Sequence, residues 1–162
     1  MNTSNWIGLF NRAFKAMDYR LEQVLQLQSC REHWIQAELS LYAYFYDNLE
    51  IWTDADIGNG KKADLYAVDE QGRNTMVAEI KCLGDYSQAK CLEGGWSIRN
   101  DIERLKQVDC PARLFILVIP HLDEGHAETR VGARLRAENW AGQEGQAVDV
   151  ALSSASVRIW AV

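Results

Sequence analysis

The chain has 162 residues, of which 48% are apolar and 25% are charged, a composition that fits one globular domain with an ordinary core. Its net charge of −6 argues against a broad basic surface for nucleic acid, whereas a local basic rim stays compatible with it. No apolar stretch approaches the ~18 residues of a membrane helix. Charged side chains interrupt the apolar residues of the N-terminal segment, which argues against a secretory signal.

The cysteine pattern bears on the compartment. The cysteines occur without a Cys-x-x-C pair and without a histidine at a zinc-finger spacing; they are Cys30, Cys82, Cys91 and Cys110. Reduced thiols of an intracellular protein are the simplest interpretation, and a disulfide or redox role is the alternative. Together with the lack of a membrane segment, this pattern predicts a cytoplasmic protein.

Two helices are predicted in the first third of the chain. Apolar residues recur at helical spacing from about Trp6 to Leu27. The four residues from Ser29 to Glu32 match the capping-box pattern, in which a glutamate bonds back to the first residue of the pattern. A second helix is therefore expected from there to about Tyr46.

A group of strands follows the helices. Leu49–Thr53 is a short strand candidate, and two longer candidates, Lys62–Val68 and Met76–Lys81, flank the polar hairpin connection Asp69–Asn74. Three successive antiparallel strands are therefore expected.

The second half is predicted to add helices on both sides of the sheet. Gly84 to Trp96 is expected to be a loop, a helix opens at Ser97 or Asn100, and Arg113–Ile119 has the length and β-branched content of a buried strand. The remaining candidates are a helix around Glu128 to Asn139 and two terminal strands, Val148–Leu152 and Ser156–Trp160. This order predicts an α/β fold with a central mixed sheet flanked by helices.

Charged side chains stand inside the strand candidates, where they are costly to place. Alternation along Met76–Lys81 directs Glu79 and Lys81 to one face, roughly 7 Å apart at ~3.3 Å per residue. If the strand of Asp64 pairs with this one as a hairpin, a second carboxylate joins them. Two carboxylates and an ammonium around one point make a site for a divalent cation and a charge-stabilising lysine. A surface ion pair between Glu79 and Lys81 is the plainer alternative.

Glu38 adds a carboxylate from a separate element. Trp34, Ile35, Leu41 and Tyr42 share its face of the predicted helix. A glutamate on an apolar stripe is costly unless it is paired or bound to a metal. Glu38 is therefore a candidate fourth member of the site, and the alternative is an edge position that reaches water or a nearby base.

With these residues the chain resembles the PD-(D/E)xK nuclease superfamily. The matching residues are Glu38, Asp64 after Ala63, and the run Glu79-Ile80-Lys81; Ala63 stands where the pattern has a proline. The resemblance covers about the middle 90 residues. It implies a restriction-endonuclease-like αβββαβ core at about residues 29–120. A helical segment, 1–28, precedes this core and a helix with strands, 121–162, follows it, all in one domain, 1–162.

The resemblance implies metal-dependent hydrolysis of phosphodiester bonds. Asp64 and Glu79 would hold Mg²⁺ or Mn²⁺, with the carbonyl oxygen of Ile80 as a further ligand. Glu38 would steer the attacking water or help to bind a second ion. Lys81 would orient or deprotonate that water, or neutralise charge that develops on the phosphate.

The resemblance also points to polar residues on the helix after the Glu-x-Lys strand as substrate contacts. Asp101, Arg104 and Lys106 are the candidates, Arg99 is similar, and a solvated helix surface is the alternative. Trp96 is the candidate aromatic contact to the substrate. The implied partner is nucleic acid, DNA in the first place, and a homodimer stays open.

Two further interpretations compete with a nuclease. A nuclease fold without activity would act as a binding module, such as an accessory subunit or an inhibitor of a basic partner, which the acidic charge and small size favour. An unrelated α/β domain with a chance motif would place Asp64 and Glu79 on opposite faces of the sheet.

Overall fold

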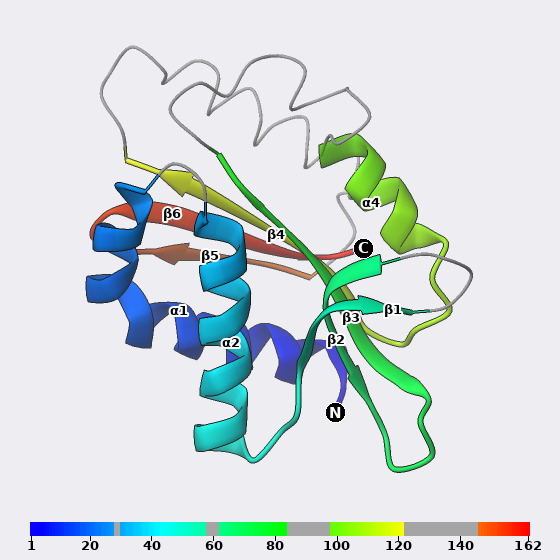
Figure 1. Cartoon of the computed structure of the whole chain (residues 1–162). Helices are drawn as coiled ribbons and strands as arrows, with labels where there is room; N and C mark the ends of the chain where they lie inside the picture. The colour runs from blue at the N-terminus through cyan, green and yellow to red at the C-terminus, as the bar shows by residue number, and fades with distance from the viewer. Residues whose placement is uncertain (28–29, 58–61, 84–97, 122–145) are drawn as a thin grey trace.

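The computed structural model describes residues 1–27, 30–57, 62–83, 98–121 and 146–162. Within these ranges the chain forms three helices and one six-stranded mixed sheet (Figure 1). The elements are α1 (Thr3–Leu25), α2 (Arg31–Asp47), β1 (Trp52–Asp56), β2 (Lys62–Val68), β3 (Asn74–Cys82), α4 (Ile98–Lys106), β4 (Arg113–Pro120), β5 (Ala147–Ala151) and β6 (Ala155–Ala161). The predicted loop from Gly84 to Trp96 and the predicted helix around Glu128 to Asn139 lie outside the described residues.

Both N-terminal helices form where the apolar periodicity predicts them. α1 starts after Asn2, whose side chain accepts a hydrogen bond from the amide of Asn5 at 2.9 Å. α2 starts after Cys30, which makes no side-chain capping hydrogen bond. Ser29, the first residue of the predicted capping box, lies outside the described residues, and one oxygen of Glu32 accepts a hydrogen bond from the amide of Cys82.

The sheet has the strand order β1-β2-β3-β4-β6-β5, and only β3 and β4 among these neighbours run parallel. Parallel neighbours need a crossover connection, and α4 lies in the chain between these two strands. The three antiparallel strands after α2 are confirmed. β1 begins at Trp52 rather than at Leu49, because the amide of Leu49 donates to the carbonyl of Ala43 and still closes the end of α2.

Helices cover both faces of the sheet. α1 and α2 pack on one face through a large apolar cluster that also contains β4 and β6 residues. α4 packs on the other face (Figure 1). In the apolar cluster on that face, Phe115 and Trp160 lie with their ring centroids 5.7 Å apart. The coarse prediction of a mixed sheet flanked by helices is confirmed. None of the described helices is both long enough and apolar enough to span a bilayer.

Candidate functional site

Strands β2 and β3 separate at one end, and Asp64 lies at the point of separation. The backbone of β2 pairs with β3 as far as Leu65 opposite Ala78, whereas it pairs with β1 as far as Lys62. Beyond that point the amide of Ile80 donates to the Asp64 carboxylate at 2.7 Å, in place of a backbone carbonyl. The other Asp64 oxygen accepts a hydrogen bond from the buried side chain of Gln36 on α2 at 3.0 Å. Asp64 is thus held between a strand edge and a helix.

Glu79 is a buried carboxylate beside this opening. Glu79 is 4% exposed and lies on the face of the sheet that α4 covers. Arg104 of α4 donates a hydrogen bond from Nε to Glu79 Oε1 at 3.1 Å, and its Nη2 lies 2.9 Å from the same oxygen as an ion pair. A contact with a cationic side chain offsets part of the cost of burying this carboxylate.

Lys81 lies between two more carboxylates. Its Nζ is 3.5 Å from Asp101 of α4 and 3.8 Å from Glu32 of α2. Asp101 also accepts from Arg104 at 3.0 Å, and Glu32 accepts from the amide of Cys82 at 2.8 Å. The cluster therefore joins α2, β2, β3 and α4 through four carboxylates and two cationic side chains.

Three of the four carboxylates in the cluster have a raised pKa. Burial, and then the nearby charge of Asp64, raises the pKa of Glu79 to about 9, against the opposing effect of Arg104. Burial likewise raises the pKa of Glu32 and of Asp101, which Lys81 partly offsets. With all groups ionised the cluster would carry two uncompensated negative charges, and without a further cation the protein relieves this repulsion by protonation.

For Lys81 the surrounding carboxylates, and not burial, raise the pKa. Burial alone would lower it, but the charges of Glu32, Asp101 and Asp64 outweigh burial and raise it above its usual value. Lys81 is therefore a fixed ammonium at neutral pH and not a proton acceptor in the metal-free protein. Among the roles predicted for it, orienting water and neutralising charge fit this state best.

Glu79→Gln is expected to remove a pH dependence of stability. The folded-state pKa of Glu79 is about 9, above the ordinary glutamate value of 4.5, so the folded protein binds an extra proton between these two pH values. This stabilising contribution is complete below the lower pKa and is lost as the pH rises through the upper one. We expect the free energy of unfolding of the wild type to fall relative to the variant, by at most about 1.4 kcal/mol per pH unit.

Urea unfolding in EDTA at pH 5 to 9 measures this difference. Glu103→Gln, at an exposed residue of α4, is the matched control and should leave the slope of the wild type unchanged. Equal slopes for wild type and Glu79→Gln would show that Arg104 keeps Glu79 ionised.

The structure brings together three of the four predicted catalytic residues. Asp64, Glu79 and Lys81 converge at one end of the sheet, as the hairpin argument predicts. Glu38 does not join them, because it forms an ion pair with Arg20 of α1. It follows Gln36 by two residues, about 200° around the helix, and so lies on nearly the opposite side of α2.

Glu32 and Gln36 are the contributions of α2 to the cluster, and neither was predicted from the sequence. They are four residues apart and so share one face of the helix. Their i, i+4 spacing is visible in the sequence, but Glu32 also fits a capping box, and Glu38 stands on a more apolar stripe. Asp101 was a candidate only as a substrate contact; it is 5% exposed and bonds both cationic side chains of the cluster.

The substrate-contact candidates divide in the same way. Arg104 belongs to the cluster, whereas Arg99 is exposed at the start of α4. Lys106 pairs with Glu103, which is not one of the four carboxylates of the cluster, at 3.1 Å. Trp96 lies outside the described residues. In the described part of the chain, Asp101 and Arg104 are therefore the substrate-contact candidates that contact predicted site residues, Lys81 and Glu79 respectively.

The donor set fits a hard divalent cation in its chemistry. Asp64 and Glu79 supply carboxylates, and the carbonyl of Ile80 lies on the same strand edge as its amide, which faces Asp64. Across the described ranges no group of three or more His, Cys, Asp or Glu side chains is arranged to hold a metal ion. Mg²⁺ commonly uses only one or two carboxylates and keeps several waters, so a two-carboxylate site is compatible with it.

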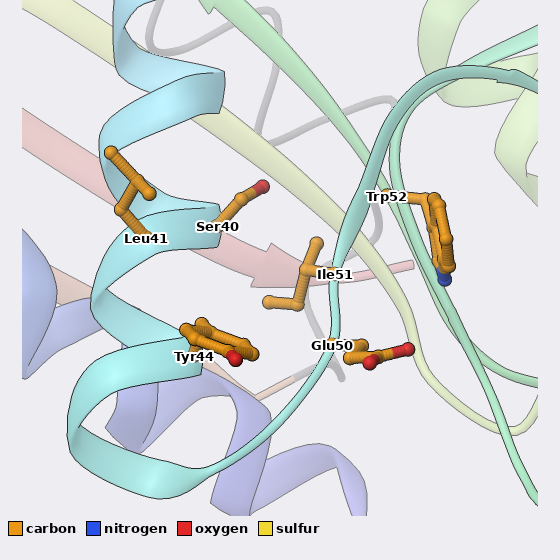
Figure 2. A pocket seen from close by; sticks show the side chains of 6 residues that line it. All are labelled: Ser40, Leu41, Tyr44, Glu50, Ile51 and Trp52. Atoms are coloured by element: carbon orange, nitrogen blue, oxygen red, sulfur yellow. The ribbon is translucent and has the colours of Figure 1, made fainter.

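The described residues also form a hollow of about 240 Å³ away from the carboxylate cluster (Figure 2). It lies between α2 and the segment that leads into β1, and its lining includes Ser40, Tyr44, Ile51 and Trp52. Glu50 is the only carboxylate in that lining. This hollow therefore lacks the grouped charges that the cluster offers for chemistry.

Comparisons with known proteins place no family name on this arrangement: no family model, no curated protein and no solved structure matches the chain.

Proposed function

We propose that the protein is a metal-dependent nuclease that hydrolyses phosphodiester bonds, with DNA as the expected substrate. The observation that carries the proposal is the meeting of Asp64, Glu79 and Lys81 in a cluster whose carboxylates exceed its cationic groups by two. One divalent cation has the charge that this cluster lacks. The order α2-β1-β2-β3-α4-β4 also supports a restriction-endonuclease-like core, since it is the αβββαβ order that the resemblance implies.

Each residue of the cluster has a task in this proposal. Asp64 and Glu79 would hold Mg²⁺ or Mn²⁺, with the Ile80 carbonyl as a third protein oxygen. The bound ion would supply an activated water and offset charge on the phosphate. Lys81 would place its ammonium beside the reacting phosphate, where a fixed positive charge stabilises the negative charge that develops. Gln36 orients Asp64 through its hydrogen bond of 3.0 Å.

The direct test is cleavage by the purified wild-type protein. Plasmid DNA, single-stranded DNA and RNA are incubated with Mg²⁺, with Mn²⁺, or with EDTA. We expect cleavage of DNA with either ion and none with EDTA, because the cluster alone lacks the charge to stabilise a phosphate transition state. DNA that stays intact with both ions, or that is cut equally in EDTA, would refute the proposal.

A binding module is the second candidate, and specific contacts favour it. Both Asp64 oxygens are occupied by protein donors, and Arg104 already occupies Glu79. A site saturated in this way stabilises a fold without a metal. Isothermal calorimetry that detects no binding of Mn²⁺, together with intact nucleic acid, would favour this candidate.

A further inference from the structure

Arg104 covers the carboxylate that the proposed function assigns to the metal. Both of its contacts to Glu79, at 2.9 and 3.1 Å, go to the same oxygen, Oε1. The Arg104 side chain is 33% exposed and that of Glu79 is 5% exposed, so Arg104 is the more accessible of the two. A cation that binds Glu79 through Oε1 therefore competes with Arg104 for that oxygen.

Arg104 has a second anchor that does not depend on Glu79. Its Nη2 is 3.0 Å from Asp101, which is three residues earlier on α4 and is itself held by Lys81 at 3.5 Å. Loss of the contact to Glu79 would leave the guanidinium tethered to Asp101 at the edge of the cluster. A planar guanidinium presents several N–H donors and suits phosphate oxygens as well as carboxylates.

We propose that Arg104 is a displaceable partner of Glu79 that a divalent cation must remove from Oε1, and that the released guanidinium then binds a phosphate oxygen of the substrate. This inference rests on the proposed nuclease function. Two cations on one carboxylate repel each other, so Arg104 lowers the affinity of the metal-free site for the ion. A released Arg104 adds positive charge at the open side of the cluster, so ion and phosphate favour each other's binding.

The test compares Mn²⁺ binding by calorimetry, without substrate, in the wild type and in Arg104→Gln. Glutamine removes the charge and the competing contact, so we expect the dissociation constant for Mn²⁺ to fall about tenfold, equivalent to about 1.4 kcal/mol. Lys106→Gln is the matched control, because it removes a positive charge from the same helix at a side chain paired with Glu103. Its dissociation constant should equal that of the wild type.

A second measurement uses the wild-type protein and does not depend on how the variant folds. The Nε–H of Arg104 donates to Glu79, so its ¹⁵N resonance should shift when Mg²⁺ is added, with the midpoint that calorimetry gives for Mg²⁺. The resonance should shift again when a non-cleavable oligonucleotide is added to the Mg²⁺-bound protein.

The outcomes separate the two proposals. If the wild type binds Mn²⁺ and Arg104→Gln binds it with equal or weaker affinity, the displacement inference is wrong and the nuclease proposal survives. If the Arg104 ¹⁵N resonance does not shift on addition of Mg²⁺ while calorimetry detects binding, the displacement inference is likewise wrong. If neither protein binds Mn²⁺ or Mg²⁺, both proposals fail.

Discussion

Asp64→Asn is expected to make the metal-free protein more stable and to abolish its cleavage activity. Within the described residues the hydrogen-bond donors to Asp64 are neutral: the amide of Ile80 and the side chain of Gln36. Its charge raises the pKa of Glu79 and contributes to the raised pKa of Glu32 and Asp101. Asparagine keeps the shape and one carbonyl acceptor while it removes this repulsion, so we expect a gain of about 1 kcal/mol in EDTA.

The cleavage rate of Asp64→Asn should fall about 1,000-fold, because a lost metal ligand removes several kcal/mol of transition-state stabilisation. Urea unfolding in EDTA measures the gain in stability, and plasmid cleavage in Mn²⁺ measures the loss of activity. Asp54→Asn is the matched control, at an exposed residue of β1 that pairs with Lys62. It should stay within about 0.5 kcal/mol of the wild type in stability and should cleave at the wild-type rate.

The two measurements on Asp64→Asn distinguish a functional from a structural aspartate. A stabilised and inactive variant is the behaviour of a residue whose charge serves function at a cost to the fold. A destabilised variant that still cuts DNA would show that Asp64 serves the fold alone and would remove the central ligand of the proposed site.

Short-range patterns account for what the sequence predicted correctly. Asp64, Glu79 and Lys81 stand on two adjacent strands joined by the connection Asp69–Asn74. Alternation and hairpin pairing therefore suffice to place them near one another. The same local signals predict α1 and the buried strand β4, because each has a strong apolar pattern of one period.

The contribution of α2 could not be predicted in the same way. Both Glu32 and Glu38 have apolar neighbours at helical spacing, and periodicity does not say which side of a helix faces the open end of the sheet. Which glutamate faces the cluster depends on how α1 and the sheet pack against α2. Arg20 of α1 forms an ion pair with Glu38, whereas the amide of Cys82 in β3 donates a hydrogen bond to Glu32. Only the tertiary arrangement separates these two glutamates.

The position of α4 was equally beyond local patterns. The sequence predicted a helix that opens at Ser97 or Asn100, and α4 spans Ile98–Lys106. The ion pairs of Asp101 and Arg104, however, depend on how this helix packs on the sheet. Charged residues at i and i+3 on a helix usually form a solvated pair. Here their burial against β3 turns the pair into part of the cluster.

Lys81→Met is expected to separate binding of the metal from cleavage. Methionine keeps an unbranched apolar stem of similar length but has no charge. The carboxylates of Glu32 and Asp101 lose the ammonium at 3.8 and 3.5 Å, and burial, which already raises the pKa of both, should drive them to take up protons. Asp64 and Glu79 keep their oxygens, so Mn²⁺ should bind at least as tightly as in the wild type.

Cleavage by Lys81→Met should fall by roughly 100-fold or more, the loss expected when a group that acts on the transition state is removed. Calorimetry with Mn²⁺ and the plasmid assay give the two readouts on the same preparation. Lys15→Met, at an exposed position of α1, is the matched control and should leave both unchanged. Glu38→Gln tests the helix residue that the sequence favoured, and its ion pair with Arg20 predicts near-wild-type cleavage. If Lys81→Met cuts DNA at the wild-type rate, the buried ammonium serves only to neutralise Glu32 and Asp101, and the chemistry must reside elsewhere in the chain.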